Sequence, residues 1–142
     1  MNNGQVFESF NLASLWKLPV LYIIENNKYG MGTSVDRAAA GSDLYKRGKP
    51  FGIPGEMVDG MNVFKVIEAA YKAGKHVREA KGPFILEVQT YRYRGHSMSD
   101  PAKYRTKEEL ESYKNKDPIQ IAYEEILKKK IATKKELEKI NN

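Results

Sequence analysis

A strongly apolar run at residues 20–24 ends abruptly, and two neighbouring asparagines, Asn26 and Asn27, follow it closely. The run has the length and the β-branched content of a buried strand, and a glycine-containing turn follows within a few residues. In open α/β sheets, ligands bind at the carboxyl ends of the strands. The segment therefore predicts side-chain oxygen donors at the ligand-binding edge of a sheet.

The pattern of the following segments favours an α/β fold. Residues 4–16 and 63–77 have apolar side chains at helical spacing. Residues 56–58 and 84–91 are typical of strands, so the order strand, helix, strand predicts a right-handed parallel crossover. The second helix presents one apolar stripe, which consists of Val63, Val66, Ile67, Ala70, Ala73 and Val77.

Two other segments lack a sustained period. Residues 25–55 are rich in glycine and small side chains, which predicts a functional loop region interrupted by short turns or by a helix at residues 35–40. Residues 92–105 combine basic, hydroxyl and imidazole groups with almost no aliphatic side chain, so we expect polar contacts or a ligand to hold them. Arg92, Arg94 and Arg105 are candidates for anion binding or for ordinary surface charges, and Tyr91, Tyr93 and Tyr104 are expected to pack.

The carboxy-terminal part mixes lysines with glutamates and predicts helices at residues 107–113, 118–130 and 133–140. The last of these begins at a capping box formed by Thr133 and Glu136. We therefore divide the chain into an α/β portion, residues 1–106, and a charged helical tail, residues 107–142.

Composition excludes several classes of function. The 142 residues include no cysteine, which excludes disulfides, thiolate catalysis and cysteine zinc sites. The net charge is +6, but charges of both signs lie within a Debye length of one another in the tail, so we expect no nucleic-acid partner. Without an apolar run of membrane-spanning length or an export leader, we also expect no membrane partner.

The asparagine and histidine side chains leave two readings open. The Asn27 side chain and the Tyr29 carbonyl offer the hard oxygen ligands that magnesium prefers. The dipeptide alone favours a plain turn, because asparagine tolerates left-handed conformations. His96 suits proton transfer or hydrogen bonding to a phosphate, and it equally suits an incidental loop position.

The combination of motifs resembles the alpha subunits of the thiamine-diphosphate-dependent 2-oxo acid dehydrogenases, most closely those of the pyruvate dehydrogenase type. The matching segments occur in the family's order and the match weakens in the charged tail: residues 4–11, 15–19, 25–34, 37–40, 45–48, 53–55, 58–61, 89–93 and 95–101. The resemblance implies part of a doubly wound, mostly parallel sheet domain.

The resemblance also implies the site residues. The Asn27 side chain and the Tyr29 carbonyl would bind magnesium, Gly30 would lie beside thiamine diphosphate, and His96 would reach the diphosphate and the reacting centre as a catalytic residue. Asn26 and Glu25 would support the turn. The family's motif begins with Gly-Asp-Gly, whose aspartate is a further magnesium ligand, and the resemblance places it before Met1.

The implied function is the oxidative decarboxylation of pyruvate, with transfer of the acetyl group to a lipoyl-bearing acyltransferase. A beta subunit would supply the glutamate that activates the cofactor, in a heterotetramer of the bacterial cytoplasm or, in a eukaryote, the mitochondrial matrix. Three alternatives remain: a branched-chain 2-oxo acid enzyme, an acetoin enzyme, or a truncated, non-catalytic interaction module. We expect this chain alone to be inactive.

Two serines match positions that are phosphorylated in mitochondrial members of the family, Ser97 and Ser34. Lys103 stands where those members carry a further serine, and the loop is a residue shorter. These departures favour an unregulated bacterial type of enzyme.

Overall fold

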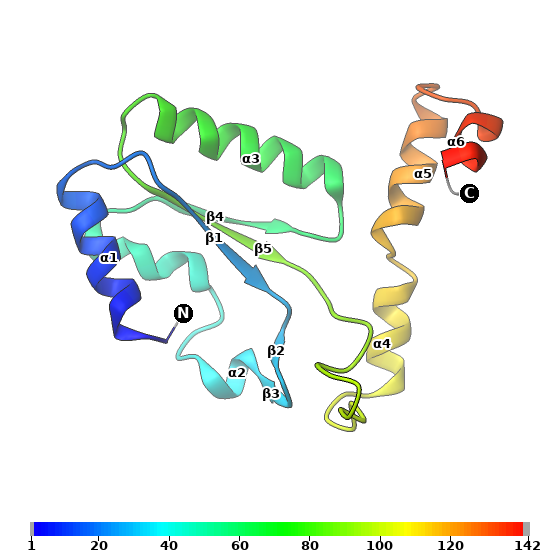
Figure 1. Ribbon diagram of the computed structural model, residues 1–142, viewed down its shortest axis with the longest axis horizontal. Coiled ribbons are helices and arrows are strands. Elements are labelled where there is room, and N and C mark those ends of the chain that lie inside the picture. Colours follow the sequence, from blue (N-terminus) through cyan, green and yellow to red (C-terminus); the bar gives the residue numbers. More distant parts are fainter. Residues whose placement is uncertain (1, 141–142) are drawn as a thin grey trace.

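A parallel sheet of three strands lies at the centre of the fold (Figure 1). Strand β5 (Phe84–Gln89) is the middle strand, with β1 (Leu21–Asn26) on one side and β4 (Gly55–Asp59) on the other. The computed structural model describes residues 2–140. Its other elements are α1 (Gly4–Leu15), β2 (Tyr29–Gly30), β3 (Thr33–Ser34), α2 (Val35–Ala38), the 3₁₀ helix η1 (Leu44–Phe51), α3 (Val63–Arg78), α4 (Lys107–Lys114), α5 (Pro118–Lys128) and α6 (Lys134–Ile140).

The three strands end together at one edge of the sheet. Asn26 and Asp59, the last residues of β1 and β4, both pair with Gln89, the last residue of β5. The α/β prediction is confirmed, as is the parallel pairing of the two strands that α3 connects. The carboxyl edge predicted to bind ligands is therefore formed by residues far apart in the sequence.

Alternating side chains of β5 supply a separate core to each face of the sheet. Ile85 packs with Phe10 of α1 and Leu44 of η1, whereas Leu86 packs with Ala69 of α3. Leu86 is only 1% exposed, and truncation of such a side chain to alanine costs about 2–5 kcal/mol. The helices thus cover both faces, as a doubly wound arrangement requires.

The apolar stripe of α3 is offset from the predicted one. Val63 and Ile67 are 42% and 47% exposed, whereas Ala69, Ala73 and Val77 are buried against the sheet. Small alanine side chains let the helix approach the strands closely, so they occupy the contact in place of the larger Ile67. The predicted helix is confirmed, including its cap by Asn62, but the face it buries was partly wrong.

The segment between β1 and β4 contains more regular structure than predicted. The hairpin β2–β3 follows the asparagines, α2 occupies the predicted helical position, and η1 was missed. Gly48 and Pro50 disfavour a regular α-helix in η1. Gly48 also lies so close to the sheet that a Cβ there would be 2.5 Å from Ile85 Cδ1. Short elements of this kind have no detectable period.

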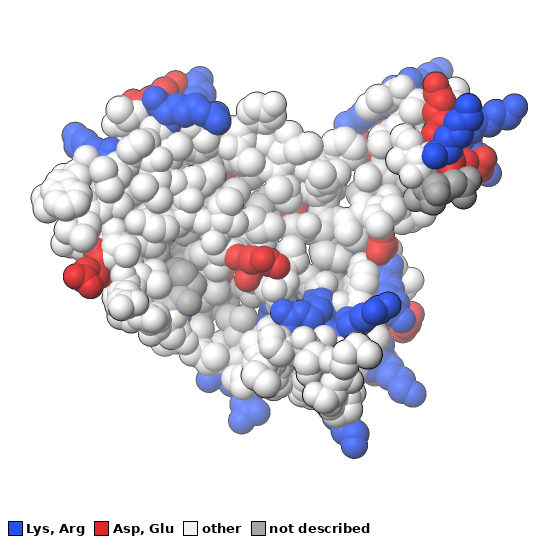
Figure 2. All heavy atoms as spheres, in the orientation of Figure 1, with Lys and Arg blue, Asp and Glu red and all other residues white. Residues whose placement is uncertain are grey.

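Helices α4, α5 and α6 form an arm beyond the carboxyl edge of the sheet (Figure 1). Its base is held by Tyr91, whose ring stacks on Tyr113 of α4 at a centroid distance of 3.9 Å. The predicted capping box is confirmed, because Thr133 N donates to Glu136 over 2.7 Å. Figure 2 shows charges of both signs side by side at the end of the arm.

No helix within residues 2–140 combines the length and the apolar character needed to cross a membrane.

Candidate functional site

The last residue of β1 and the four residues after it form a tight turn, residues 26–30, which we call the asparagine turn. Asn26 is only 4% exposed, and its Oδ1 accepts a hydrogen bond from Lys28 N over 3.0 Å. Lys28 adopts a φ of +66°, in the left-handed region that few side chains favour. The Asn26 side chain thus closes the turn around Asn27 and stabilises an otherwise unfavourable backbone.

Asn27 points its side-chain oxygen towards the end of β5. Its Oδ1 accepts from Thr90 Oγ1 over 2.6 Å, and its Nδ2 donates to Glu25 over 3.3 Å. A carbonyl oxygen has a second lone pair, so Asn27 Oδ1 can bind a cation while it holds Thr90. Glu25 and Asn26 both support the turn, in agreement with the expected roles.

Tyr29 and Gly30 form β2, the first strand of the hairpin. The Tyr29 hydroxyl lies 3.1 Å and 3.2 Å from the two carboxylate oxygens of Glu109 in α4. Burial first, and Glu109 second, raise the pKa of Tyr29 above its usual range, so the phenol remains a donor at neutral pH. Gly30 is exposed, and within residues 2–140 a Cβ there would meet no atom closer than 4 Å beyond its chain neighbours.

The second half of the site is the histidine loop, residues 92–105. Asp100 organises it by accepting hydrogen bonds from His96 N over 2.7 Å and from Ala102 N and the Tyr104 hydroxyl over 2.8 Å each. These donors, the His96 amide foremost, hold the pKa of Asp100 below its usual range. Of the two alternatives expected for this loop, polar contacts or a ligand, the structure shows the polar contacts.

The arginines of the loop differ in their surroundings. Arg105 donates to the carbonyl oxygens of Arg92 and Tyr93, the latter over 2.7 Å, and lies against the Tyr91 ring. Arg105 is therefore a structural residue here, which neither sequence alternative anticipated. Arg92 Nη1 lies 3.1 Å from His96 Nδ1. Since a guanidinium only donates, Nδ1 accepts and the proton of the neutral ring is assigned to Nε2.

Tyrosine contacts bring the asparagine turn and the histidine loop together. The rings of Tyr29 and Tyr104 lie 5.3 Å apart between centroids. A Cβ at Gly32, in the hairpin connection, would lie 3.3 Å from the Tyr104 ring. Tyr104 in turn donates to Asp100, which holds the amide of His96. The predicted turn and the predicted histidine are therefore parts of one packed unit.

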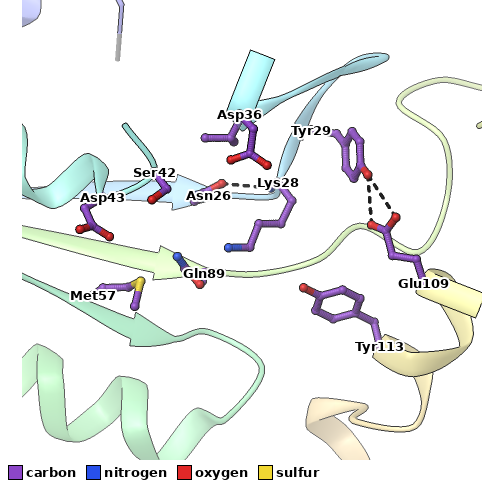
Figure 3. A pocket seen from close by; sticks show the side chains of 11 residues that line it. Asn26, Lys28, Tyr29, Asp36, Ser42, Asp43, Met57, Gln89, Glu109 and Tyr113 are labelled. Atoms are coloured by element: carbon purple, nitrogen blue, oxygen red, sulfur yellow. Dashed lines mark hydrogen bonds between the residues drawn. The ribbon is translucent and has the colours of Figure 1, made fainter. Parts of the chain in front are cut away.

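A pocket of about 360 Å³ opens at the carboxyl edge beside the asparagine turn (Figure 3). Lys28 extends into it, and Tyr29 with Glu109 lies at its side. Sequence reasoning missed most of its polar lining because these residues come from α2, the segment before η1 and the helix α4: Asp36, Ser42, Asp43, Glu109 and Tyr113. Their sequence separation from the asparagines left no local signal.

The two candidate modification sites have different exposure. Ser97 is exposed beside His96, and its Oγ lies 3.1 Å from Ser99 Oγ. Ser34 is half-buried at the start of α2 and makes no side-chain capping bond. Ser97 is therefore the more accessible of the two hydroxyls.

The donor set suits a hard cation that takes other ligands from a bound anion. Within residues 2–140, no three His, Cys, Asp or Glu side chains cluster to form a metal site. Asn27 Oδ1 and the Tyr29 carbonyl are neutral oxygens, and magnesium commonly completes its octahedron with water and phosphate oxygens. The residues present fit part of such a site.

Comparison with known proteins agrees with the motifs. Proteins named pyruvate dehydrogenase E1 component subunit alpha are 57% identical to this chain in Rickettsia felis and in Rhizobium meliloti, and a mitochondrial protein of that name from Sminthopsis macroura is 53% identical. Each comparison covers 99% of this chain and 43%, 40% and 39% of the respective relative. The chain thus spans about two fifths of the length of these relatives. The family model described as "Dehydrogenase E1 component" matches residues 1–142, and the chain belongs to this family.

Proposed function

We propose that this chain provides the magnesium-diphosphate part of the alpha subunit of a thiamine-diphosphate-dependent pyruvate dehydrogenase. The observation that carries the proposal is the placement of Asn27 Oδ1, which Thr90 orients at the carboxyl edge of a parallel sheet. The names of the relatives support pyruvate over branched-chain 2-oxo acids or acetoin.

In this proposal, Asn27 and Tyr29 bind the magnesium ion through the side-chain oxygen and the backbone carbonyl. Gly30, which no atom of the described residues crowds, leaves room for the diphosphate of the cofactor. When bound, thiamine diphosphate supplies the electron sink that decarboxylation of a 2-oxo acid requires. The protein's task at this edge is to orient the diphosphate and to neutralise its charge with the ion.

His96 is the proposed catalytic residue. Arg92 occupies Nδ1, so Nε2 is the ring atom available to donate a hydrogen bond to a diphosphate oxygen or to exchange a proton with the substrate. Asp100 fixes the backbone of His96, which limits the positions the imidazole can reach. In this proposal the histidine loop, whose Tyr104 packs against Tyr29, carries the proton-transferring group.

The proposed partners are a beta subunit, which completes the site in a heterotetramer, and a lipoyl-bearing acyltransferase, which accepts the acetyl group. Pyruvate oxidation of this kind links glycolysis to acetyl-CoA synthesis. The proposed compartment is the cytoplasm of a bacterium or the mitochondrial matrix of a eukaryote.

Reconstitution tests this function. The chain is mixed with a family beta subunit, magnesium, thiamine diphosphate and one of three substrates: pyruvate, a branched-chain 2-oxo acid or acetoin. Substrate-dependent reduction of an artificial electron acceptor and binding of the cofactor are measured in parallel, with Asn27→Ala as the matched control. Cofactor binding that requires magnesium and Asn27 supports the proposal, and pyruvate turnover extends it. The absence of both binding and turnover would support a non-catalytic interaction module instead.

Ser97 and Ser34 are proposed phosphorylation sites of lower priority, since Lys103 departs from the mitochondrial pattern. A phosphate on Ser97 would add a charge of about −1.5 to −2 beside His96 and would repel a bound diphosphate. Incubation with the mitochondrial kinase and labelled ATP checks this, and the absence of label on Ser97 would rule it out.

A further inference from the structure

Glu87 is an ionisable residue in the interior of the sheet that the proposed chemistry does not use. It lies on the central strand β5, and its exposed fraction is 0%. It shares the face of the sheet with Ile85, towards α1 and η1. Burial of a carboxylate is unfavourable unless hydrogen bonds replace its lost hydration, so its partners indicate what it does.

The two carboxylate oxygens of Glu87 connect two other segments of the chain. Oε1 accepts from Asn26 Nδ2 over 2.7 Å, and Oε2 accepts from Tyr45 N over 3.0 Å. A third and longer contact, 3.5 Å, comes from Gln89 Nε2. Glu87 therefore joins the end of β1 to the start of η1. Asn26 and Asp43, the residue that precedes η1, also line the pocket at the sheet edge.

The contact with Glu87 determines which way the Asn26 amide points. With Nδ2 directed to the carboxylate, Oδ1 is free to accept from Lys28 N, the bond that closes the asparagine turn. If the amide were reversed, its NH₂ group would face the Lys28 N–H and the turn would lose that bond. Glu87 is thus connected to Asn27 through one side chain and one turn.

We propose that Glu87 is a positioning residue for the asparagine turn. It orients Asn26, Asn26 closes the turn, and the turn directs the Asn27 oxygen to the carboxyl edge. This assignment deepens the proposed function, on which its relevance to metal binding rests. The hydrogen-bond pattern itself is a property of the chain without any ligand.

The role requires a group with two acceptors and no donor, which distinguishes glutamate from glutamine. In Glu87→Gln, the new NH₂ group faces a donor either at Asn26 or at Tyr45. Either Asn26 reverses and Lys28 N loses its acceptor, or Tyr45 N loses its acceptor. In the exchanged pair Glu87→Gln with Asn26→Asp, the new glutamine donates to the new aspartate and still accepts from Tyr45, while the aspartate still accepts from Lys28. Only the long Gln89 contact is lost.

Amide hydrogen exchange, measured by NMR on the full chain, tests this arrangement. For Glu87→Gln we expect exchange at Lys28 or Tyr45 to accelerate roughly tenfold, because one hydrogen bond is lost. The exchanged pair is expected to restore slow exchange at both amides. Glu56→Gln on the neighbouring strand β4, where the carboxylate pairs with exposed Lys72, is the matched control and should leave both amides unchanged.

Each result decides for or against the role. Unchanged exchange at both amides in Glu87→Gln would overturn it. If Glu87→Gln does not fold, a folded exchanged pair with both amides protected supports the role, and an unfolded exchanged pair overturns it. Binding of manganese with thiamine diphosphate to the unchanged chain is measured separately. Failure of that binding would count against the proposed function, while the exchange data would still decide the role of Glu87.

Discussion

Thr90 Oγ1 donates a hydrogen bond to Asn27 Oδ1 over 2.6 Å. A second hydrogen bond joins the same two segments through the backbone, because Thr90 N donates to Asn26 O over 2.9 Å. The proposed metal-binding oxygen is therefore oriented from the end of the central strand before any ion arrives. An oriented ligand loses less conformational freedom on binding, which favours affinity.

Replacement of Thr90 by valine should weaken metal-dependent cofactor binding. The loss of one hydrogen bond costs about 0.5–1.5 kcal/mol, so we expect a roughly two- to tenfold higher dissociation constant. Thr90→Ser keeps the hydroxyl and is the control. Titration calorimetry with magnesium and thiamine diphosphate measures both variants, and equal affinity of Thr90→Val and the unchanged chain would contradict the role of this bond.

Tyr29 and Glu109 should contribute jointly to stability. The Tyr29–Glu109 pair is partly exposed, so its hydrogen bond should contribute about 1 kcal/mol to the free energy of unfolding. Tyr29→Phe and Glu109→Gln should each lower this free energy, and the double variant should lose less than the sum of the two single losses. Because the folded-state pKa of Tyr29 is raised, the stabilisation is complete below about pH 10 and is lost as the pH rises through the raised value. Urea unfolding at pH 7 and pH 11 measures this. If the stability of Tyr29→Phe depended on pH as that of the unchanged chain does, the assignment would be contradicted. Glu108→Gln, at an exposed position in the same helical turn as Glu109, serves as the control.

The stabilising contribution of Asp100 to the histidine loop should be lost at low pH, whereas that of Tyr29 is lost at high pH. The lowered pKa of Asp100 means that its contribution is present above the unfolded value of about 3.9 and is lost as the pH falls through the folded value. The amide signal of His96, followed by NMR from pH 6 downwards, should shift with a midpoint below about 3.9. Asp100→Asn should abolish this titration, and Asp36→Asn should preserve it. A titration midpoint at or above the unfolded pKa would show that the hydrogen bonds to the Asp100 carboxylate do not form in solution.

Gly95→Ala should displace the histidine loop. A Cβ at residue 95 would lie 2.5 Å from the carbonyl oxygen of Asp100, and this backbone atom has little freedom to move. We expect faster tryptic cleavage at the arginines of the loop. Gly4→Ala is the control, because a Cβ there would meet no atom within 4 Å in the part of the chain that the structure describes. Equal cleavage of both variants would contradict the close contact at Gly95.

Local sequence patterns were sufficient to predict the elements that have periodic apolar residues or begin at a recognisable helix cap. The strand before Asn26, the helix after Asn62 and the box at Thr133 were all found in this way. The buried side of α3 was harder to predict, because its apolar residues extend beyond one face. Close packing selected Ala69 and Ala73 over the larger Ile67, which no single-sequence pattern specifies.

The residues that support the site could not be predicted from the sequence, for a different reason. Tyr29 and Glu109 are 80 positions apart, and Asn26 and Glu87 are 61 positions apart. One signal was available: Glu87 lies between Leu86 and Val88 in a mostly apolar strand, where an ionisable side chain needs a buried partner. The identity of that partner depends on strand order, which places β5 next to β1 despite their separation in the sequence.

The most direct test of the account is whether a metal ion with thiamine diphosphate binds at Asn27. Manganese is added to the isotopically labelled chain with thiamine diphosphate, and paramagnetic broadening is followed by NMR for each amide. We predict that broadening centres on Asn27, Tyr29 and Gly30, extends to His96, spares α5 and α6, and disappears in Asn27→Ala. Broadening that centres on other residues, or that persists unchanged in Asn27→Ala, would contradict the account.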